Sequence, residues 1–428
     1  MRLPTRPSPD SSAAKRIAVI AWLLICVLSG WCRPTLADAE VGETGASDTP
    51  TAVAASVRVE SLRAETLALL ESALIASGVE DAQHRAACLT QFARIAASLK
   101  SQRGNTVRSP EEVAADVHRH LHATLLTGQY VAECSEVERV FDEGVYNCVS
   151  ATVVFHALCT ELDLHRVAVA RRTHVFSRLP ESDLDVETTC AEWFDVPVAE
   201  RPHVEAEERE ISDRALIGKI YFNRGVALLE QRDFAAAIEL IRTSLLWDAH
   251  DPSARENLLA GLNNWALAEC DARRFASAAR LIDEGLAIDA TYQPLLANDL
   301  HVRQRWVVDL CDHGRFAAAR DVLQAGFRRR PDAELFDNGR LAVYRLWAKW
   351  LIHRGQLREG FAVFDEARRL VGERPDVEAC ESVTLREAAR ELQEAGRHQE
   401  ASQVVAWSHR APQNDSSGSV RRLAPRGT

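Results

Sequence analysis

Three residue types follow one another along the chain in an order that could carry nucleophilic chemistry. Cys148 comes first, His174 follows it, and two carboxylates, Asp185 and Glu187, come next. A thiolate can attack a carbonyl carbon, a neighbouring imidazole can take and return the proton, and a carboxylate can orient the imidazole. The order therefore indicates a thiol nucleophile that acts on an amide or an ester.

The residues around Cys148 predict how its thiol is presented. The largely apolar run from Asn147 to Glu161 predicts a buried helix that Cys148 opens. A helix N-terminus carries free N–H groups and the positive end of the helix dipole, and both favour the thiolate. A single cysteine in an apolar helix is more often a core residue, so the catalytic assignment depends on His174 and the acid.

Short alternating runs after this helix are typical of strands, and a tight turn between the second and third runs predicts a hairpin. The runs cover Val167 to Ala170, His174 to Leu179 and Leu184 to Thr188.

The hairpin register separates the two carboxylates. If Leu179 faces Leu184, Glu187 lies on the diagonal from His174, within roughly 7 Å. Asp185 is then about 13 Å from the imidazole, at roughly 3.3 Å per residue. We therefore favour Glu187 as the orienting acid, with Asp185 as the alternative if a bulge shifts the pairing.

Helical patterns precede this segment, so residues 58–210 are predicted to be an α+β domain of helices followed by an antiparallel sheet. The acidic run from Arg201 to Asp213 is expected to link this domain to the C-terminal half of the chain. The predicted helices cover Val59 to Ala76, Ala82 to Leu99 and Pro110 to Leu126.

Three segments resemble the Cys, His and acid segments of bacterial transglutaminase-like proteins, a branch of the papain-like thiol enzymes. The resemblance covers Gln129 to Trp193, and it implies a transglutaminase-like fold with a catalytic triad of Cys148, His174 and an acid. In most of that superfamily the acid is Asp followed by Pro, whereas here Glu187 precedes Thr188. Members include proteases, amidases, acyltransferases and inactive relatives. The segments are Asn147-Cys148-Val149-Ser150-Ala151, Thr173-His174-Val175-Phe176 and Asp185-Val186-Glu187-Thr188-Thr189.

Residues 218–412 contain five repeats, because five marker positions follow one another at equal intervals of 41 residues. Small residues stand nine positions before most markers and three positions after every one, where two antiparallel helices would touch. This spacing resembles tetratricopeptide (TPR) repeats, which implies an all-α solenoid whose groove holds a protein or peptide. A spacer or packing platform is the alternative. The markers are Phe234, Phe275, Phe316, Leu357 and His398, and the small residues predicted to be buried include Gly225, Ala237, Ala278 and Ala319.

The N-terminus predicts export. A basic stretch, an apolar run and the Ala37-Asp38-Ala39 signal make residues 1–39 a secretory signal peptide or a membrane anchor. Residues 40–57 are expected to be a flexible spacer and residues 413–428 a disordered tail. The protein is thus expected in the periplasm or at the cell surface, and it would touch a membrane only through this N-terminal segment.

Charge and cysteine content limit the possible partners. A formal net charge of -11 argues against nucleic acid as a ligand. His118, His120 and His122 are expected on a solvated surface rather than on a metal, and no cofactor or metal is predicted.

Cysteine pairing is left open by the sequence, because export permits disulfides. Cys270 and Cys311, at equivalent repeat positions, are expected to be buried small apolar residues.

Two functions compete. The first is an exported transglutaminase-like cysteine hydrolase or acyltransferase whose repeats recruit a protein or peptide substrate. The second is a non-catalytic TPR scaffold with a degenerate transglutaminase-like domain. Enzymatic activity is therefore left open by the sequence.

Overall fold

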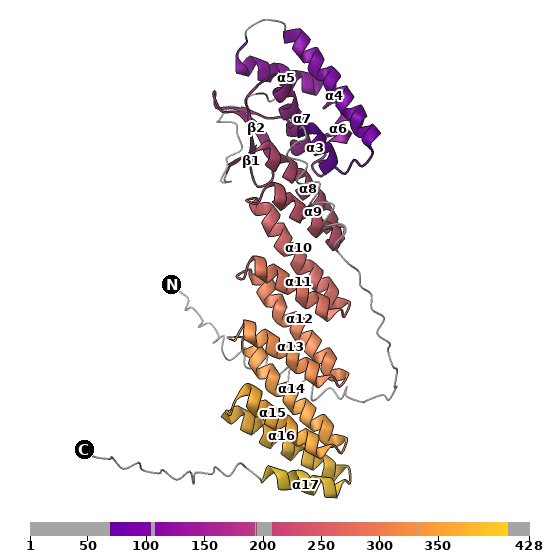
Figure 1. The fold of residues 1–428 in the computed structure, drawn as a ribbon, viewed down its shortest axis with the longest axis vertical. Helices are drawn as coiled ribbons and strands as arrows, with labels where there is room; N and C mark the ends of the chain where they lie inside the picture. Colours follow the sequence, from indigo (N-terminus) through magenta and orange to yellow (C-terminus); the bar gives the residue numbers. More distant parts are fainter. Residues whose placement is uncertain (1–68, 104–107, 193, 195–207, 332, 410–428) are drawn as a thin grey trace, which may run out of the picture. The chain divides into compact units, whose positions relative to one another are not determined.

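A computed structural model describes residues 69–103, 108–192, 194, 208–331 and 333–409 (Figure 1). The predicted signal or anchor segment, the spacer, the C-terminal tail and the first part of the predicted Val59 to Ala76 helix lie outside these residues. None of the described helices is long and apolar enough to span a membrane. The chain divides into two compact units, one with Gly42–Ala268 and Arg280–Leu296, the other with Glu269–Ala279 and the residues from Ala297 onward.

Among the described residues five helices precede the sheet, and four of them agree with predicted helices. The start of α5 shows why: Ser109 caps it in a capping box with Glu112, and Pro110 occupies the first turn. The short helix α6 was not predicted. The helices are α3 (Leu69–Ala76), α4 (Ala82–Arg103), α5 (Pro110–Thr124), α6 (Glu138–Asp142) and α7 (Cys148–Glu161).

The sheet is antiparallel, with its four strands in the order β3-β2-β1-β4. Leu179 pairs with Leu184, which confirms the predicted hairpin register. The Arg201 to Asp213 segment was wrongly expected to be only a link, because part of it forms the edge strand β4 beside β1. The strands are β1 (Val167–Ala170), β2 (Val175–Leu179), β3 (Leu184–Val186) and β4 (Arg209–Ile211).

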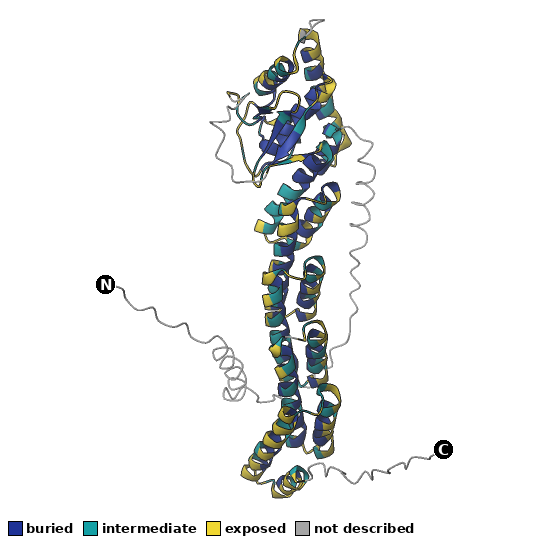
Figure 2. Ribbon diagram, turned by 90° about the vertical axis from the view of Figure 1, so that its left-hand side faces the viewer, coloured by how far each residue is buried: buried dark blue, intermediate teal, exposed yellow. Residues whose placement is uncertain are grey.

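The expected α+β transglutaminase-like domain is not evident in the structure, so that fold prediction was wrong. The described residues are mainly helical, and the sheet is small, with strands of three to five residues. An alternating pattern locates a strand but does not show how much sheet surrounds it. The centre of this unit is instead the helix α7, whose residues from Cys148 to Cys159 are all buried. The strands of the sheet are also largely buried and are drawn mostly in dark blue in Figure 2.

In the part of the chain that the structure describes, ten helices follow the sheet as five consecutive pairs, and each predicted marker position is the first residue of the second helix of a pair. This agrees with the predicted repeat of 41 residues. The first helices of the last four pairs have 20 residues each, so the long period lengthens helices rather than loops. The pairs are α8 (Asp213–Glu230) with α9 (Phe234–Trp247), α10 (Pro252–Asp271) with α11 (Phe275–Ile288), α12 (Gln293–Asp312) with α13 (Phe316–Arg329), α14 (Glu334–His353) with α15 (Leu357–Val371), and α16 (Pro375–Glu394) with α17 (His398–Ser408).

The small residues lie where the helices of a pair approach closely. A Cβ added to Gly225 would stand 2.7 Å from Cγ1 of Ile241, and one added to Gly360 would stand 2.8 Å from Cγ1 of Ile352. Neither neighbour leaves room for a side chain. The predicted burial is confirmed at Gly225, Ala237, Ala278 and Ala319.

The described cysteines are free thiols. Cys270 is buried as expected, whereas Cys311 is only half-buried.

Candidate active site

Cys148 is the first residue of α7, and its position is fixed by the cap that precedes it. Oδ1 of Asn147 accepts hydrogen bonds from the N–H groups of Val149 at 2.9 Å and Ser150 at 3.0 Å. Oγ of Ser150 accepts from the N–H of Asn147 in return, at 2.9 Å. This capping box stops the helix at Cys148, so the thiol lies at the positive end of the helix.

His174 stands just before β2 and lies between the thiol and an acid. Its Nε2 is 2.7 Å from Oε2 of Glu187, and His174 and Cys148 line the same cavity. Burial lowers the pKa of His174, but hydrogen bonds with Cys148 and Glu187 outweigh burial and raise this pKa to about 10. The imidazole is therefore protonated at neutral pH, and an imidazolium stabilises an adjacent thiolate.

Glu187 is held as a carboxylate. Its Oε1 accepts from the N–H of Thr189 at 3.0 Å and from Oγ1 of Thr189 at 2.6 Å. Burial raises the pKa of Glu187, but the hydrogen bonds with His174 and Thr189 outweigh it, so the pKa is lowered. The acid is thus ionised and oriented toward the imidazole at the same time.

The segment that carries Glu187 continues past the end of β3 and is fixed by contacts with two helices. Nε2 of His118, on α5, is 3.0 Å from the carbonyl oxygen of Glu187. Oγ1 of Thr152, on α7, is 2.9 Å from Oγ1 of Thr188. Because both anchors are buried side chains, the carboxylate position depends on the packing of α5 and α7.

The three neighbouring histidines of α5 are not all on a solvated surface, so that prediction was wrong for His118. His118 is buried, whereas His120 and His122 are half-buried. The rings of His118 and His122 stand 4.7 Å apart. Burial lowers the pKa of His118, which favours a neutral imidazole that donates to the Glu187 carbonyl.

Asp185, the alternative acid, has a different partner. Nε and Nη2 of Arg178 donate to its two carboxylate oxygens, at 2.5 and 3.1 Å. These residues are directly opposite each other on β2 and β3. Of the two candidate acids, Glu187 is thus the one bonded to His174, and Asp185 forms an ion pair within the sheet.

Sequence reasoning missed Tyr130, which stands beside the thiol. Although Tyr130 is 47% exposed, partial burial and the neighbouring Cys148 raise the pKa of Tyr130 to about 12. The phenol therefore stays a hydrogen-bond donor. The position of Tyr130 depends on its bridge with Tyr146, a contact between segments that local spacing does not reveal.

A cavity of about 470 Å³ opens onto the candidate triad. Cys148 and His174 line it together with residues of α8 and α10. The thiol is nearly buried, at 7% exposure, so a substrate would reach it through this cavity.

Other thiols lie in environments that keep them protonated. Burial raises the pKa of Cys88 and of Cys134 to about 11, and nearby carboxylates add to the effect. Burial also raises the pKa of Cys159. None of these four thiols is in a disulfide, and Cys148 differs from the other three in having His174 beside it.

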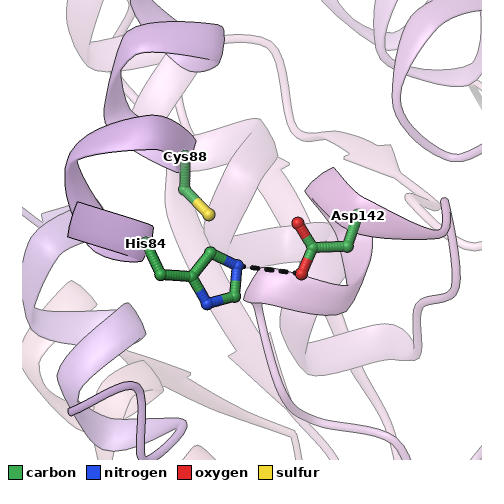
Figure 3. A group of neighbouring side chains, drawn as sticks. All are labelled: His84, Cys88 and Asp142. Atoms are coloured by element: carbon green, nitrogen blue, oxygen red, sulfur yellow. Dashed lines mark hydrogen bonds and ion pairs between the residues drawn. The ribbon is translucent and has the colours of Figure 1, made fainter. Parts of the chain in front are cut away.

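One group of side chains among the described residues has the composition of a metal site (Figure 3). The possible ligand atoms of His84, Cys88 and Asp142 all lie within 4.8 Å of one another. His84 Nε2 already bonds Oδ2 of Asp142, at 2.9 Å, and an ion would have to displace the Cys88 proton. Sequence reasoning missed this group, and only the i, i+4 spacing of His84 and Cys88 could have indicated it.

Comparisons with protein-family models and with curated proteins return no match for this chain. The interpretation of the site therefore depends on its own geometry.

Proposed function

We propose that this protein is a cysteine-dependent hydrolase or acyltransferase that acts on amide or ester bonds of a protein or peptide. The observation that carries the proposal is His174, which is hydrogen-bonded to Glu187, interacts with Cys148 and lines the same cavity as that thiol. Thiol, imidazole and carboxylate in this order are the groups that covalent acyl transfer requires.

In the proposed reaction the Cys148 thiolate attacks the substrate carbonyl carbon. The His174 imidazolium then gives its proton to the departing amine or alcohol as the carbon–nitrogen or carbon–oxygen bond breaks, which leaves a thioester on Cys148. Neutral His174 next takes a proton from water or from an acceptor amine, which attacks the thioester and releases the thiolate. Glu187 stabilises the imidazolium and fixes its ring.

Two donors are available for the oxyanion that forms on the carbonyl oxygen. The N–H of Cys148 has no intrahelical acceptor, because it belongs to the first turn of α7. The Tyr130 hydroxyl is the second, since Tyr130 interacts with Cys148. Donors placed in this way stabilise the charge that develops in the transition state.

The helical repeats supply the recruiting surface in this proposal, because stacked helix pairs present an extended face to a polypeptide. Export to the periplasm or cell surface stays a prediction, since the N-terminal segment lies outside the described residues.

The proposal is tested with p-nitrophenyl acetate and mass spectrometry. The wild-type protein should release nitrophenol in a burst and carry one acetyl group on Cys148. Replacement His174→Ala should slow the acetylation about 10² to 10⁴-fold, because the imidazolium and the general base are both lost.

The control is Cys159→Ala, which removes a thiol that is buried away from the triad and should leave the burst intact. Equal acetylation of Cys148 in wild type and His174→Ala would show an ordinary exposed thiol, and the non-catalytic scaffold would then be the better interpretation.

A further inference from the structure

The cavity at Cys148 has a second wall made of repeat helices. Along α8 the lining residues recur at intervals of three and four, so they form one face of the helix. α10 contributes a similar stripe. The α8 residues are Lys219, Phe222, Asn223, Val226, Ala227 and Glu230, and the α10 residues are Ser253, Glu256, Asn257 and Ala260.

This wall is held firmly to the helix of the nucleophile. His156 of α7 is fully buried, and its Nδ1 is 2.7 Å from Oδ1 of Asp213, the first residue of α8. Arg166 donates to the other oxygen of Asp213, at 2.8 Å. α8 also shares one apolar core with α7. A substrate carbonyl that reaches Cys148 must therefore lie against α8.

The dimensions of the wall fit an extended polypeptide. The stripe on α8 runs from Lys219 to Glu230, which corresponds to roughly 16 Å at about 1.5 Å per helical residue. A strand rises about 3.3 Å per residue, so roughly five substrate residues would lie along it.

The amides in the wall offer acceptors. Nδ2 of Asn223 donates to Oγ of Ser135 at 2.7 Å, and Nδ2 of Asn257 donates to the carbonyl of Ser253 at 2.9 Å. In these orientations the Oδ1 atoms of both asparagines are left to accept hydrogen bonds from a substrate.

The charges in the cavity also favour a substrate that is rich in hydrogen-bond donors, because the cationic side chains of the cavity are already paired with carboxylates. Lys219 is bound to Asp251 at 2.7 Å, and Arg171 is bound to Glu208 at 2.6 Å.

Two exposed carboxylates in the cavity are left without a cation. Within the described part of the chain, no ion pair or hydrogen bond is found for the side chains of Glu133 and Glu230. Near Glu230 on the same helix face, Phe222 and Val226 give an apolar surface for the stem of a long side chain. A lysine or arginine side chain matches this combination of apolar stem and terminal charge.

We infer, on the basis of the proposed function, that the substrate is an extended polypeptide segment rich in lysine or arginine. It lies along α8 and α10, and its cationic side chains pair with Glu133 and Glu230.

The test uses pentapeptides that carry a C-terminal vinyl sulfone and neutral end caps. Lysine at each position is compared with norleucine, which has a similar stem without the charge. The rate at which each peptide labels Cys148 is followed by mass spectrometry. At low salt, lysine at the preferred positions should label roughly three- to tenfold faster than norleucine, and added salt should reduce the ratio.

The double variant Glu133→Gln/Glu230→Gln should bring this ratio close to one. The matched control is Glu378→Gln, an exposed glutamate of α16, which should leave the ratio unchanged. A wild-type ratio near one, or a ratio that survives in the double variant, would overturn the inference while labelling of Cys148 still supports the enzyme. Absence of Cys148 labelling by every peptide would overturn the proposed function itself.

Discussion

The site around Cys148 and the helical repeats are built in opposite ways. In the site, polar atoms are held at hydrogen-bonding distance, as between His174 and Glu187 at 2.7 Å. In the repeats, the helices meet through small residues such as Gly225 and Ala278, which have no polar side-chain atom and are buried. A substitution at the site should therefore change the chemistry more than the stability. A substitution in the repeats should reduce the stability and leave the chemistry largely unchanged.

The largest effect is expected at the two acids Asp185 and Glu187, which are only two positions apart but should affect stability and chemistry separately. Glu187→Gln removes the charge that stabilises the His174 imidazolium, so Cys148 acetylation should slow about 10²-fold. Asp185→Asn removes a buried carboxylate and leaves the half-buried Arg178 without its main partner. The free energy of unfolding should then fall by about 2 to 3 kcal/mol, while the acetylation rate changes less than about twofold.

Burst kinetics and denaturant titration of the same two proteins measure both quantities. If Asp185→Asn slowed acetylation as much as Glu187→Gln, the distinction between an orienting acid and a sheet ion pair would be wrong.

A smaller effect, of the opposite kind, is expected in the repeats. Ala278→Leu forces a larger side chain into a fully buried position, so the free energy of unfolding should fall by about 1 to 3 kcal/mol. The matched control is Ala276→Leu, on the exposed face of the same helix, which should cost less than about 0.5 kcal/mol. Equal losses in the two variants would contradict the helix contact assigned to Ala278.

The smallest effect is expected at His118, which acts on the acid through its backbone. His118→Phe keeps a ring next to Phe194 but removes the hydrogen bond to the Glu187 carbonyl. A net hydrogen bond contributes about 1 kcal/mol, so Cys148 acetylation should slow about fivefold. His120→Phe, on a different face of α5, should not change the rate. Recovery of the rate in His118→Gln would separate positioning from a general packing defect, and an unchanged rate in His118→Phe would refute the positioning role.

The sequence predicted the parts of this molecule that depend on local spacing. The recurrence of small residues marked the helix pairs because contact between two helices repeats with the period of the chain. The hairpin register was predictable because a tight turn fixes which residues face each other. This register therefore places Glu187, rather than Asp185, next to His174.

The features that the sequence did not predict depend on contacts between distant segments. The bond from His118 to Glu187 and the position of Tyr130 beside Cys148 involve residues that no local rule connects. The size of the sheet was misjudged for the same reason, because strand patterns do not show that helices such as α7 supply much of the core. The edge strand β4 was missed because its charged residues resemble a linker.

The pKa of His174 gives the site a characteristic pH dependence. The folded-state value of about 10 lies above the ordinary value of 6.5, so the folded protein binds this proton more tightly than the unfolded chain. The resulting stability is fully present below pH 6.5 and is lost as the pH rises through about 10. For Glu187, whose pKa is lowered, the contribution is present above the ordinary carboxyl range and is lost on acidification.

The most direct test of the Cys148–His174 pairing is the rate of Cys148 alkylation by iodoacetamide at neutral pH, followed for each cysteine by mass spectrometry in wild type and His174→Ala. We predict that wild-type Cys148 is alkylated ahead of Cys88, Cys134 and Cys159, and that His174→Ala abolishes this preference. Cys148 alkylation at the same rate with and without His174 would contradict the pairing.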